Sequence, residues 1–217
     1  MDEALKIIEN EVQIVALCAM AIMYFLRIRW LMSLPATKEW AKPKNSPARG
    51  ILLSFGSVLT PWSSNGARQK MLIYIEFALF HIAVAIAIAL SFIHPYASHI
   101  LTTALTTVFV VLLGLGLLSG VLRLIRRITV PQVRVISTPD DYFSIILLNV
   151  LLALSIVALA VDNSLSYIVF FIAVTFFLLY VPWSKISHYL YLLFTKFFFG
   201  FYFGRRGVIG RTKTLEV

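Results

Sequence analysis

Two histidines inside apolar stretches are the residues of this chain with the clearest capacity for chemistry. His81 and His188 are two of only four histidines, and each lies inside or at the edge of a long apolar run. An ionisable side chain in lipid is costly unless it has a partner. A haem iron can take one imidazole from each face of the porphyrin, and a helix bundle can supply both. The pair therefore predicts a b-type haem with His81 and His188 as axial ligands of the iron.

Both histidines also have a purely structural interpretation. His81 can be a buried histidine bonded to a carbonyl, and His188 can be solvated at a membrane interface. Other redox centres are excluded by composition. The chain has one cysteine, Cys18, too few for an iron–sulfur cluster, and it has no C-x-x-C-H motif for covalently attached haem. The electron-transfer hypothesis therefore depends on a non-covalent haem b.

Basic residues near the predicted depth of the haem are candidates for binding its propionates. Anionic groups of this kind need cationic or hydrogen-bonding partners. The same residues can serve only to fix membrane topology. The candidates are Arg126, Arg127, Arg134 and Lys185.

Three further polar residues are candidates for a carrier site or a proton relay. His94 and His99 flank a short predicted turn, and Glu76 is the only acid inside a predicted span. Plain interfacial polarity for the histidines, and pairing with a basic residue for Glu76, are the alternatives. His81 and His94 are about 140° apart around a helix, and no further histidine remains to face His94. We therefore expect one haem, not two.

Composition and hydropathy predict the scaffold. The chain is 60% hydrophobic with a mean hydropathy of +0.89, whereas soluble domains average about 45–50% apolar residues. A helix crosses a bilayer in about 20 apolar residues. We therefore predict an all-α integral membrane bundle in which residues 1–217 form a single domain with five transmembrane helices. The predicted spans are Val12–Met32, Met71–His94, Ile100–Leu124, Tyr142–Val161 and Leu165–Tyr189.

The basic residues predict the orientation of the bundle. With five spans, 18 of the 19 basic residues fall on one side, and only Lys6 lies on the other. The positive-inside rule then places the N-terminus outside and the C-terminus in the cytoplasm. The net charge of +9 is explained by topology and attraction to anionic lipid, so we expect no nucleic-acid partner.

Two segments outside the spans are expected to face the cytoplasm. Residues 33–70 form a loop whose apolar part, Gly50–Leu59, is too short to span and is predicted at the interface or against a partner. Residues 197–217 form a basic tail. Within the third span, Gly116 and Gly120 have the small-x-x-x-small spacing of close helix packing, which can also let a porphyrin approach the backbone.

Three segments of the chain carry a resemblance to a known family. They are Leu79–Ile82 with Ile93–Pro95, Ser119–Arg127 with Pro131–Arg134 and Thr138–Asp141, and Tyr180–His188. In their order and spacing they resemble the gamma-subunit family of respiratory nitrate reductase, a group of five-helix membrane cytochromes b. The family includes the cytochrome subunits of heterodisulfide reductase and of complexes linked to sulfite reduction, and the long loop before span two is more similar to those.

The resemblance implies which haem is present. His81 and His188 match the two ligands of the haem nearest the cytoplasmic partner. The ligands of the second, outer haem fall on Ser91 and Phe170, which cannot ligate iron as imidazole does. The resemblance therefore implies one inner haem b, a cytoplasmic iron–sulfur redox subunit, and a quinone or methanophenazine carrier in a bacterial or archaeal cell membrane.

The predicted function is electron transfer between that carrier and the cytoplasmic subunit, as one part of an oxidoreductase in a respiratory chain. An alternative is a haem-free anchor that only tethers a cytoplasmic redox enzyme. A third interpretation, a small transporter or channel, lacks paired intramembrane charges and an evident inverted repeat.

Overall fold

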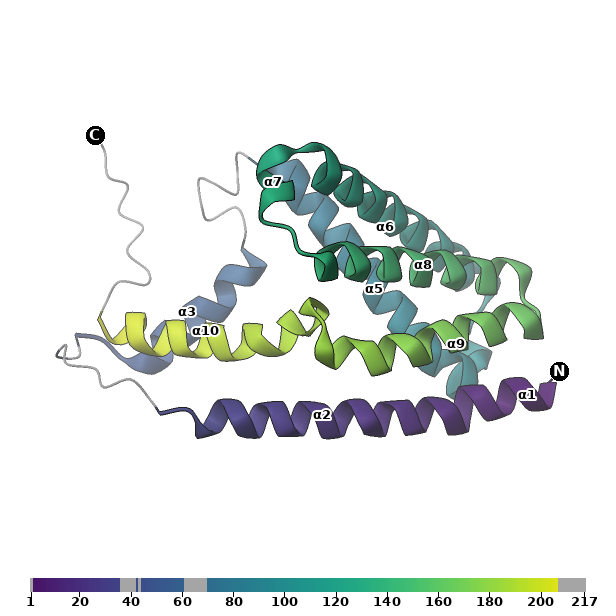
Figure 1. Cartoon of the computed structure of the whole chain (residues 1–217), viewed down its shortest axis with the longest axis horizontal. Coiled ribbons are helices and arrows are strands. Elements are labelled where there is room, and N and C mark those ends of the chain that lie inside the picture. The colour runs from purple at the N-terminus through teal and green to yellow at the C-terminus, as the bar shows by residue number, and fades with distance from the viewer. Residues whose placement is uncertain (1, 36–41, 43, 61–69, 207–217) are drawn as a thin grey trace. The chain divides into compact units, whose positions relative to one another are not determined.

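The computed structural model describes residues 2–35, 42, 44–60 and 70–206, and within these the regular structure is helical with no strand (Figure 1). The chain divides into two compact units, residues 1–30 with 75–186 and residues 31–74 with 187–217, called unit 1 and unit 2 below. The principal helices are α1 (Asp2–Lys6), a π-helix (Ile7–Val12), α2 (Gln13–Ser33), α3 (Pro47–Leu59), α5 (Met71–Ala97), α6 (Thr103–Thr129), α7 (Pro131–Val135), α8 (Pro139–Val161), α9 (Ser164–Tyr180) and α10 (His188–Arg205).

Five helical segments are long and apolar enough to cross a membrane. This confirms the predicted all-α chain with five candidate spans. The first four segments continue beyond the predicted span at one end or both, because polar residues extend the helix, whereas the fifth is shorter than predicted. The segments are Glu3–Ser33, Met71–Ile100, Thr103–Thr129, Pro139–Val161 and Ser164–Trp183.

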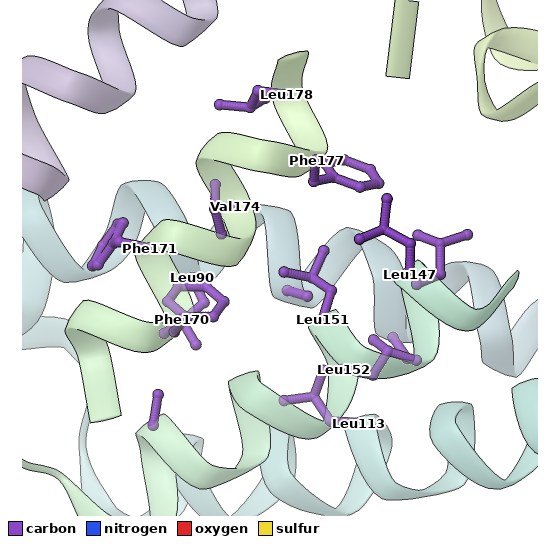
Figure 2. Close-up of a cluster of buried hydrophobic side chains, with 14 of the residues drawn as sticks. Leu90, Leu113, Leu147, Leu151, Leu152, Phe170, Phe171, Val174, Phe177 and Leu178 are labelled. Carbon is purple, nitrogen blue, oxygen red and sulfur yellow. The ribbon is translucent and has the colours of Figure 1, made fainter. Parts of the chain in front are cut away.

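The core of unit 1 lies between α5, α6, α8 and α9. Phe170 and Phe171 of α9 are fully buried, as are Leu152 of α8 and Leu113 of α6. Figure 2 shows Leu113 and Leu152 on one side of α9 and Phe171 pointing to the other side. Many apolar side chains on the outer faces of the spans are exposed, which is the pattern of helices that face lipid.

Small residues let α6 approach its neighbours closely. A Cβ added at Gly116 would collide with the Cβ of Ala83 on α5, and it would lie 3.3 Å from the carbonyl oxygen of Leu79. A Cβ at Gly120 would collide with the Asn149 side chain of α8 and lie 2.7 Å from the Phe80 ring. The helix-packing interpretation of the glycine pair is therefore confirmed.

Helices α8 and α9 are antiparallel neighbours because two residues join them. Asp162 ends α8 in the left-handed region at φ 48°, and Asn163 accepts a 2.8 Å hydrogen bond from the backbone N–H of Ser166 as the N-cap of α9. At the other end of α8, the side chains of Thr138 and Asp141 form a capping box. These caps fix both ends of α8.

The fifth span ends earlier than the sequence predicts. Helix α9 stops at Tyr180 and is followed by two short 3₁₀ turns, Val181–Trp183 and Lys185–Ser187. Pro182 supplies no backbone N–H, so it cannot continue the α-helical ladder. The prediction that one helix carries the apolar run to Tyr189 is wrong, and His188 instead begins a separate helix, α10.

Unit 2 is built on α3 and α10, which cross backbone to backbone. A Cβ at Gly204 would lie 2.5 Å from the Cα of Gly50, and one at Gly200 would lie 2.8 Å from the carbonyl oxygen of Gly50. The pair is antiparallel, because the backbone N–H of Lys44 bonds the carbonyl of Arg205 at 2.7 Å before α3 begins. Helix α3 lies in the predicted loop, and α10 extends through the start of the predicted tail.

Candidate functional site

One ring nitrogen of His81 forms a hydrogen bond within its own helix. Nδ1 lies 2.7 Å from the carbonyl oxygen of Phe77. A carbonyl can only accept, so Nδ1 carries the proton and the lone pair of the neutral ring lies on Nε2. Histidines that bind metals commonly have this arrangement, with the second nitrogen bonded to a carbonyl or carboxylate. The same hydrogen bond is expected if His81 has only a structural role. The geometry at this residue is therefore compatible with haem ligation and with a structural role.

Buried polar atoms without partners gather beside His81, around the ring of Phe80. The guanidinium of Arg123 lies 5.6 Å from this ring and 5.4 Å from the ring of Phe77. Its Nε, and both Nδ2 and Oδ1 of Asn149, are buried and make no hydrogen bond within the described residues. Asn149 and Phe80 both border the space where Gly120 lacks a side chain. Two helices, α6 and α8, thus place unsatisfied polar groups beside Phe80 of α5 in an apolar bundle.

Such atoms need an explanation, because a polar group buried without a partner costs about 1–3 kcal/mol. A bound polar or anionic ligand would satisfy them. Sequence reasoning missed both residues. Arg123 was counted only among the topological charges, and Asn149 was not singled out, although an amide in the middle of an apolar span is a signal that could have been used.

The second predicted haem ligand lies in the other unit. His188 is the first residue of α10 and is exposed, whereas His81 belongs to α5 in unit 1 and is half-buried. The structure describes each unit by itself. Ligation of one iron by both histidines therefore stays a prediction.

Two of the four predicted propionate partners share the carboxylate of Asp141. Nζ of Lys185 lies 2.6 Å from Oδ2 of Asp141, and Nη1 of Arg127 lies 3.5 Å from Oδ1 of the same residue. The neighbouring Asp140 accepts hydrogen bonds from the backbone N–H of Lys185 at 2.9 Å and from the hydroxyl of Tyr180. This network ties the start of α8 to the end of α9.

The other predicted cations differ in their surroundings. Nη1 of Arg126 lies 4.0 Å from Oε2 of Glu76, with both side chains about one-third exposed. Glu76 is thus paired with a basic residue, which is the alternative to a role in a carrier site or proton relay. Arg134 is exposed on α7.

A second polar cluster lies at the end of unit 1 that carries the π-helix. Nδ1 of His94 lies 2.7 Å from Oε2 of Glu9, and the imidazole stacks on the Tyr167 ring with centroids 3.8 Å apart. Glu9 is 8% exposed and Gln13, one turn later, is 2% exposed. Nε2 of Gln13 donates to the carbonyl of Ser91 at 3.0 Å, while its Oε1 is buried without a partner among the described residues.

Sequence reasoning missed Glu9 and Gln13. The sequence predicts that the first span begins at Val12 and that Glu76 is the only acid inside a span. Both statements are wrong, because the helix begins near Glu3 and carries Glu9 into the packed interior. The spacing of Glu9 and Gln13 by one turn was the available signal. The π-helix between them widens that turn, and such insertions are frequent at functional sites.

His94 and His99 therefore have different surroundings in the structure. His94 belongs to the buried cluster, whereas His99 is exposed in the 3₁₀ turn Ser98–Ile100. An acid–imidazole pair shielded from water can hold and pass a proton. The residues that the structure describes contain no group of three or more His, Cys, Asp or Glu side chains suited to binding a metal ion.

Replacing His94 by leucine is expected to destabilise the protein by about 1–2 kcal/mol, because it leaves the Glu9 carboxyl buried without its partner. The double variant Glu9→Leu/His94→Leu should recover part of this loss, since it leaves neither member of the pair buried without the other. Unfolding in mixed detergent micelles measures both. His99→Leu, at an exposed position, is the control and should change little. Additive losses in the double variant would show that the pair is not coupled.

Comparison with known proteins gives no match: no protein-family model, curated protein or solved structure matches this chain.

Proposed function

We propose that this protein is the haem b subunit of a membrane-bound oxidoreductase complex. In this role it transfers electrons between a membrane quinone or methanophenazine and a cytoplasmic iron–sulfur subunit. The observation that supports it best is the polar set around Phe80: the imidazole of the next residue, whose proton is held on Nδ1 by Phe77, and a guanidinium and an amide that each have buried atoms without a partner among the described residues.

The residues present fit the chemistry of a haem. His81 supplies an imidazole with its lone pair on Nε2, and Arg123 supplies a cation suited to a propionate. When bound, the iron–porphyrin supplies one-electron oxidation and reduction. His188 is proposed as the second axial ligand, from its type and its place after the fifth span. Arg126 and Arg134 are proposed as further propionate partners, whereas Arg127 and Lys185 serve the Asp141 network first.

Charge distribution supports the proposed orientation. The ends of α6 and α9 carry Arg123, Arg126, Arg127 and Lys185, whereas the opposite end of unit 1 carries Glu9 and Asp162. By the positive-inside rule the basic end faces the cytoplasm. A cytoplasmic redox subunit would then meet the protein on the side where the resemblance to the nitrate reductase gamma subunits and heterodisulfide reductase cytochromes requires it.

The Glu9–His94 pair is proposed to handle protons rather than electrons. Oxidation of a hydroquinone-type carrier releases protons, and an acid–imidazole pair can accept them. His94 lies thirteen residues from His81 on the same helix, which is about 20 Å at 1.5 Å per residue. The pair is therefore too far along α5 to contact a haem ligated by His81, and its role is a relay at the other membrane face.

The purified protein is expected to be coloured, with a reducible b-type absorption spectrum and about one haem per chain. The measurement is a dithionite-reduced minus oxidised spectrum, with haem quantified against protein in the same detergent sample. A folded, colourless protein that takes up no added haemin would refute the proposal and favour the haem-free anchor.

A further inference from the structure

The charge of this protein is segregated between its two units. Unit 2 contains eleven of the 19 basic residues and two of the ten acidic residues, so its formal net charge is +9, equal to that of the whole chain. Unit 1 contains eight of each and is formally neutral. The described residues of unit 2 include no acidic side chain at all. Membrane topology requires basic residues near the ends of spans, but it does not require one unit to contain the entire excess of positive charge.

The helices of unit 2 expose a large apolar surface alongside this charge. Because α3 and α10 touch through glycine backbone, the larger side chains project away from the crossing. Helix α10 is 18 residues long, yet it is not apolar enough to be a candidate span. Leu52 of α3 is 74% exposed, and a series on α10 is about half exposed. The α10 series is Leu193, Phe197, Phe198 and Phe199.

Basic and aromatic groups are interleaved at the end of α10. The guanidinium of Arg205 lies 5.3 Å from the ring centroid of Phe201, and that of Arg206 lies 5.5 Å from the ring centroid of Phe203. Lys196 reaches α3, where its Nζ donates to the hydroxyl of Ser57 at 3.0 Å. Aromatic rings beside cations on an apolar helix are typical of segments that lie in the membrane interface.

The chain enters and leaves unit 2 near the ends of candidate spans. It passes between the units at residues 30/31, 74/75 and 186/187, that is, near the end of the first candidate span, the start of the second and the end of the fifth. Were all five segments to cross a membrane, they would alternate in direction and these three ends would lie on one side. On that topology, α3 and α10 are connected to spans that end at that side.

We propose that unit 2 lies in the interface of that membrane face and binds anionic phospholipid head groups. Its apolar side chains enter the acyl boundary and its cations meet lipid phosphates. A membrane surface fits better than a protein partner because it offers both an apolar layer for the exposed helix pair and anionic groups for the uniformly positive charge. Each basic residue near an anionic surface strengthens binding about fivefold, so the excess of positive charge strongly favours binding. The inference does not depend on the haem.

Lipid selectivity of the full-length protein tests the proposal. Phosphatidylglycerol is titrated into detergent-solubilised protein, with phosphatidylcholine as the competitor, and bound lipid is counted by native mass spectrometry. Arg205→Gln/Arg206→Gln is expected to lower the preference for phosphatidylglycerol tenfold or more. The control Lys6→Gln/Arg29→Gln removes two exposed charges from unit 1 and should lower the preference less. Equal losses in the two variants, or no preference in the native protein, would overturn the proposal.

A second measurement reports burial of the helix pair directly. Leu52→Cys in a Cys18→Ser background is placed in nanodiscs and labelled with a membrane-impermeant maleimide. Labelling should be several-fold slower in discs containing phosphatidylglycerol than in discs of phosphatidylcholine alone. Equal rates in the two compositions, or dimers that shield Leu52→Cys in both, would show that something other than anionic lipid covers this surface.

Discussion

Replacing His81 by alanine is expected to abolish the haem spectrum completely while leaving a folded, colourless protein. The expectation follows from the proposed role, because an iron that loses one of two imidazoles loses its low-spin state and most of its hold on the site. Nδ1 of His81 bonds the Phe77 carbonyl of its own helix, and Gly116 of α6 approaches α5 at Ala83 and Leu79, so replacing His81 should leave the α5–α6 contact intact. The measurement is haem content per chain together with thermal unfolding of the apoprotein.

Chemical rescue separates ligation from a structural role. His81→Gly leaves space for a free imidazole, and adding imidazole should restore a low-spin b-type spectrum in part. A histidine that only supports the fold would not produce this spectroscopic change. His94→Ala and His99→Ala are the matched controls on the same segment and should retain the haem. Loss of the haem in His94→Ala, with retention in His81→Ala, would move the ligand to the other end of α5.

Hydropathy predicts the spans well because the lipid environment favours apolar side chains along the whole length of a crossing helix. It predicts the ends poorly, because a helix end is decided by a few local groups. Pro182 stops α9 although the apolar run continues around it, and the helix that begins at His188 has no hydropathy signal of its own. Glu9 shows the opposite error, because a helix can continue through polar residues when tertiary contacts satisfy them.

The candidate sites depend on contacts that no local pattern contains. Glu9 and His94 are 85 residues apart, and their bond forms only because the first helix packs beside α5 and α9. Arg123 and Asn149 similarly meet at Phe80 from α6 and α8. Sequence can indicate that such polar residues need partners in an apolar bundle. Which partners they find is a property of the packing.

The packing of α5 on α6 is expected to fail when Gly116 is replaced by leucine, with a loss of about 3 kcal/mol in unfolding free energy, the upper part of the usual range for overpacking. Even one added carbon would collide with the Cβ of Ala83, which is fully buried, and would press on the carbonyl of Leu79. Neither atom can rotate away, because one is a Cβ and the other is backbone. The helices must separate instead, which removes the close contacts that α5 makes around Gly116 and Gly120.

Gly114 provides a matched control two residues earlier on the same helix. A Cβ at Gly114 meets nothing within 4 Å, so Gly114→Leu should be neutral or slightly stabilising, since leucine favours helix over glycine. A swap tests the contact itself: Gly116→Ala should be destabilising alone, and Ala83→Gly/Gly116→Ala should recover much of the loss by returning the methyl group to the interface from the other side. Unfolding in mixed micelles measures all four variants. Equal effects of leucine at positions 114 and 116 would mean that helix propensity, rather than the approach of α5, determines the role of these glycines.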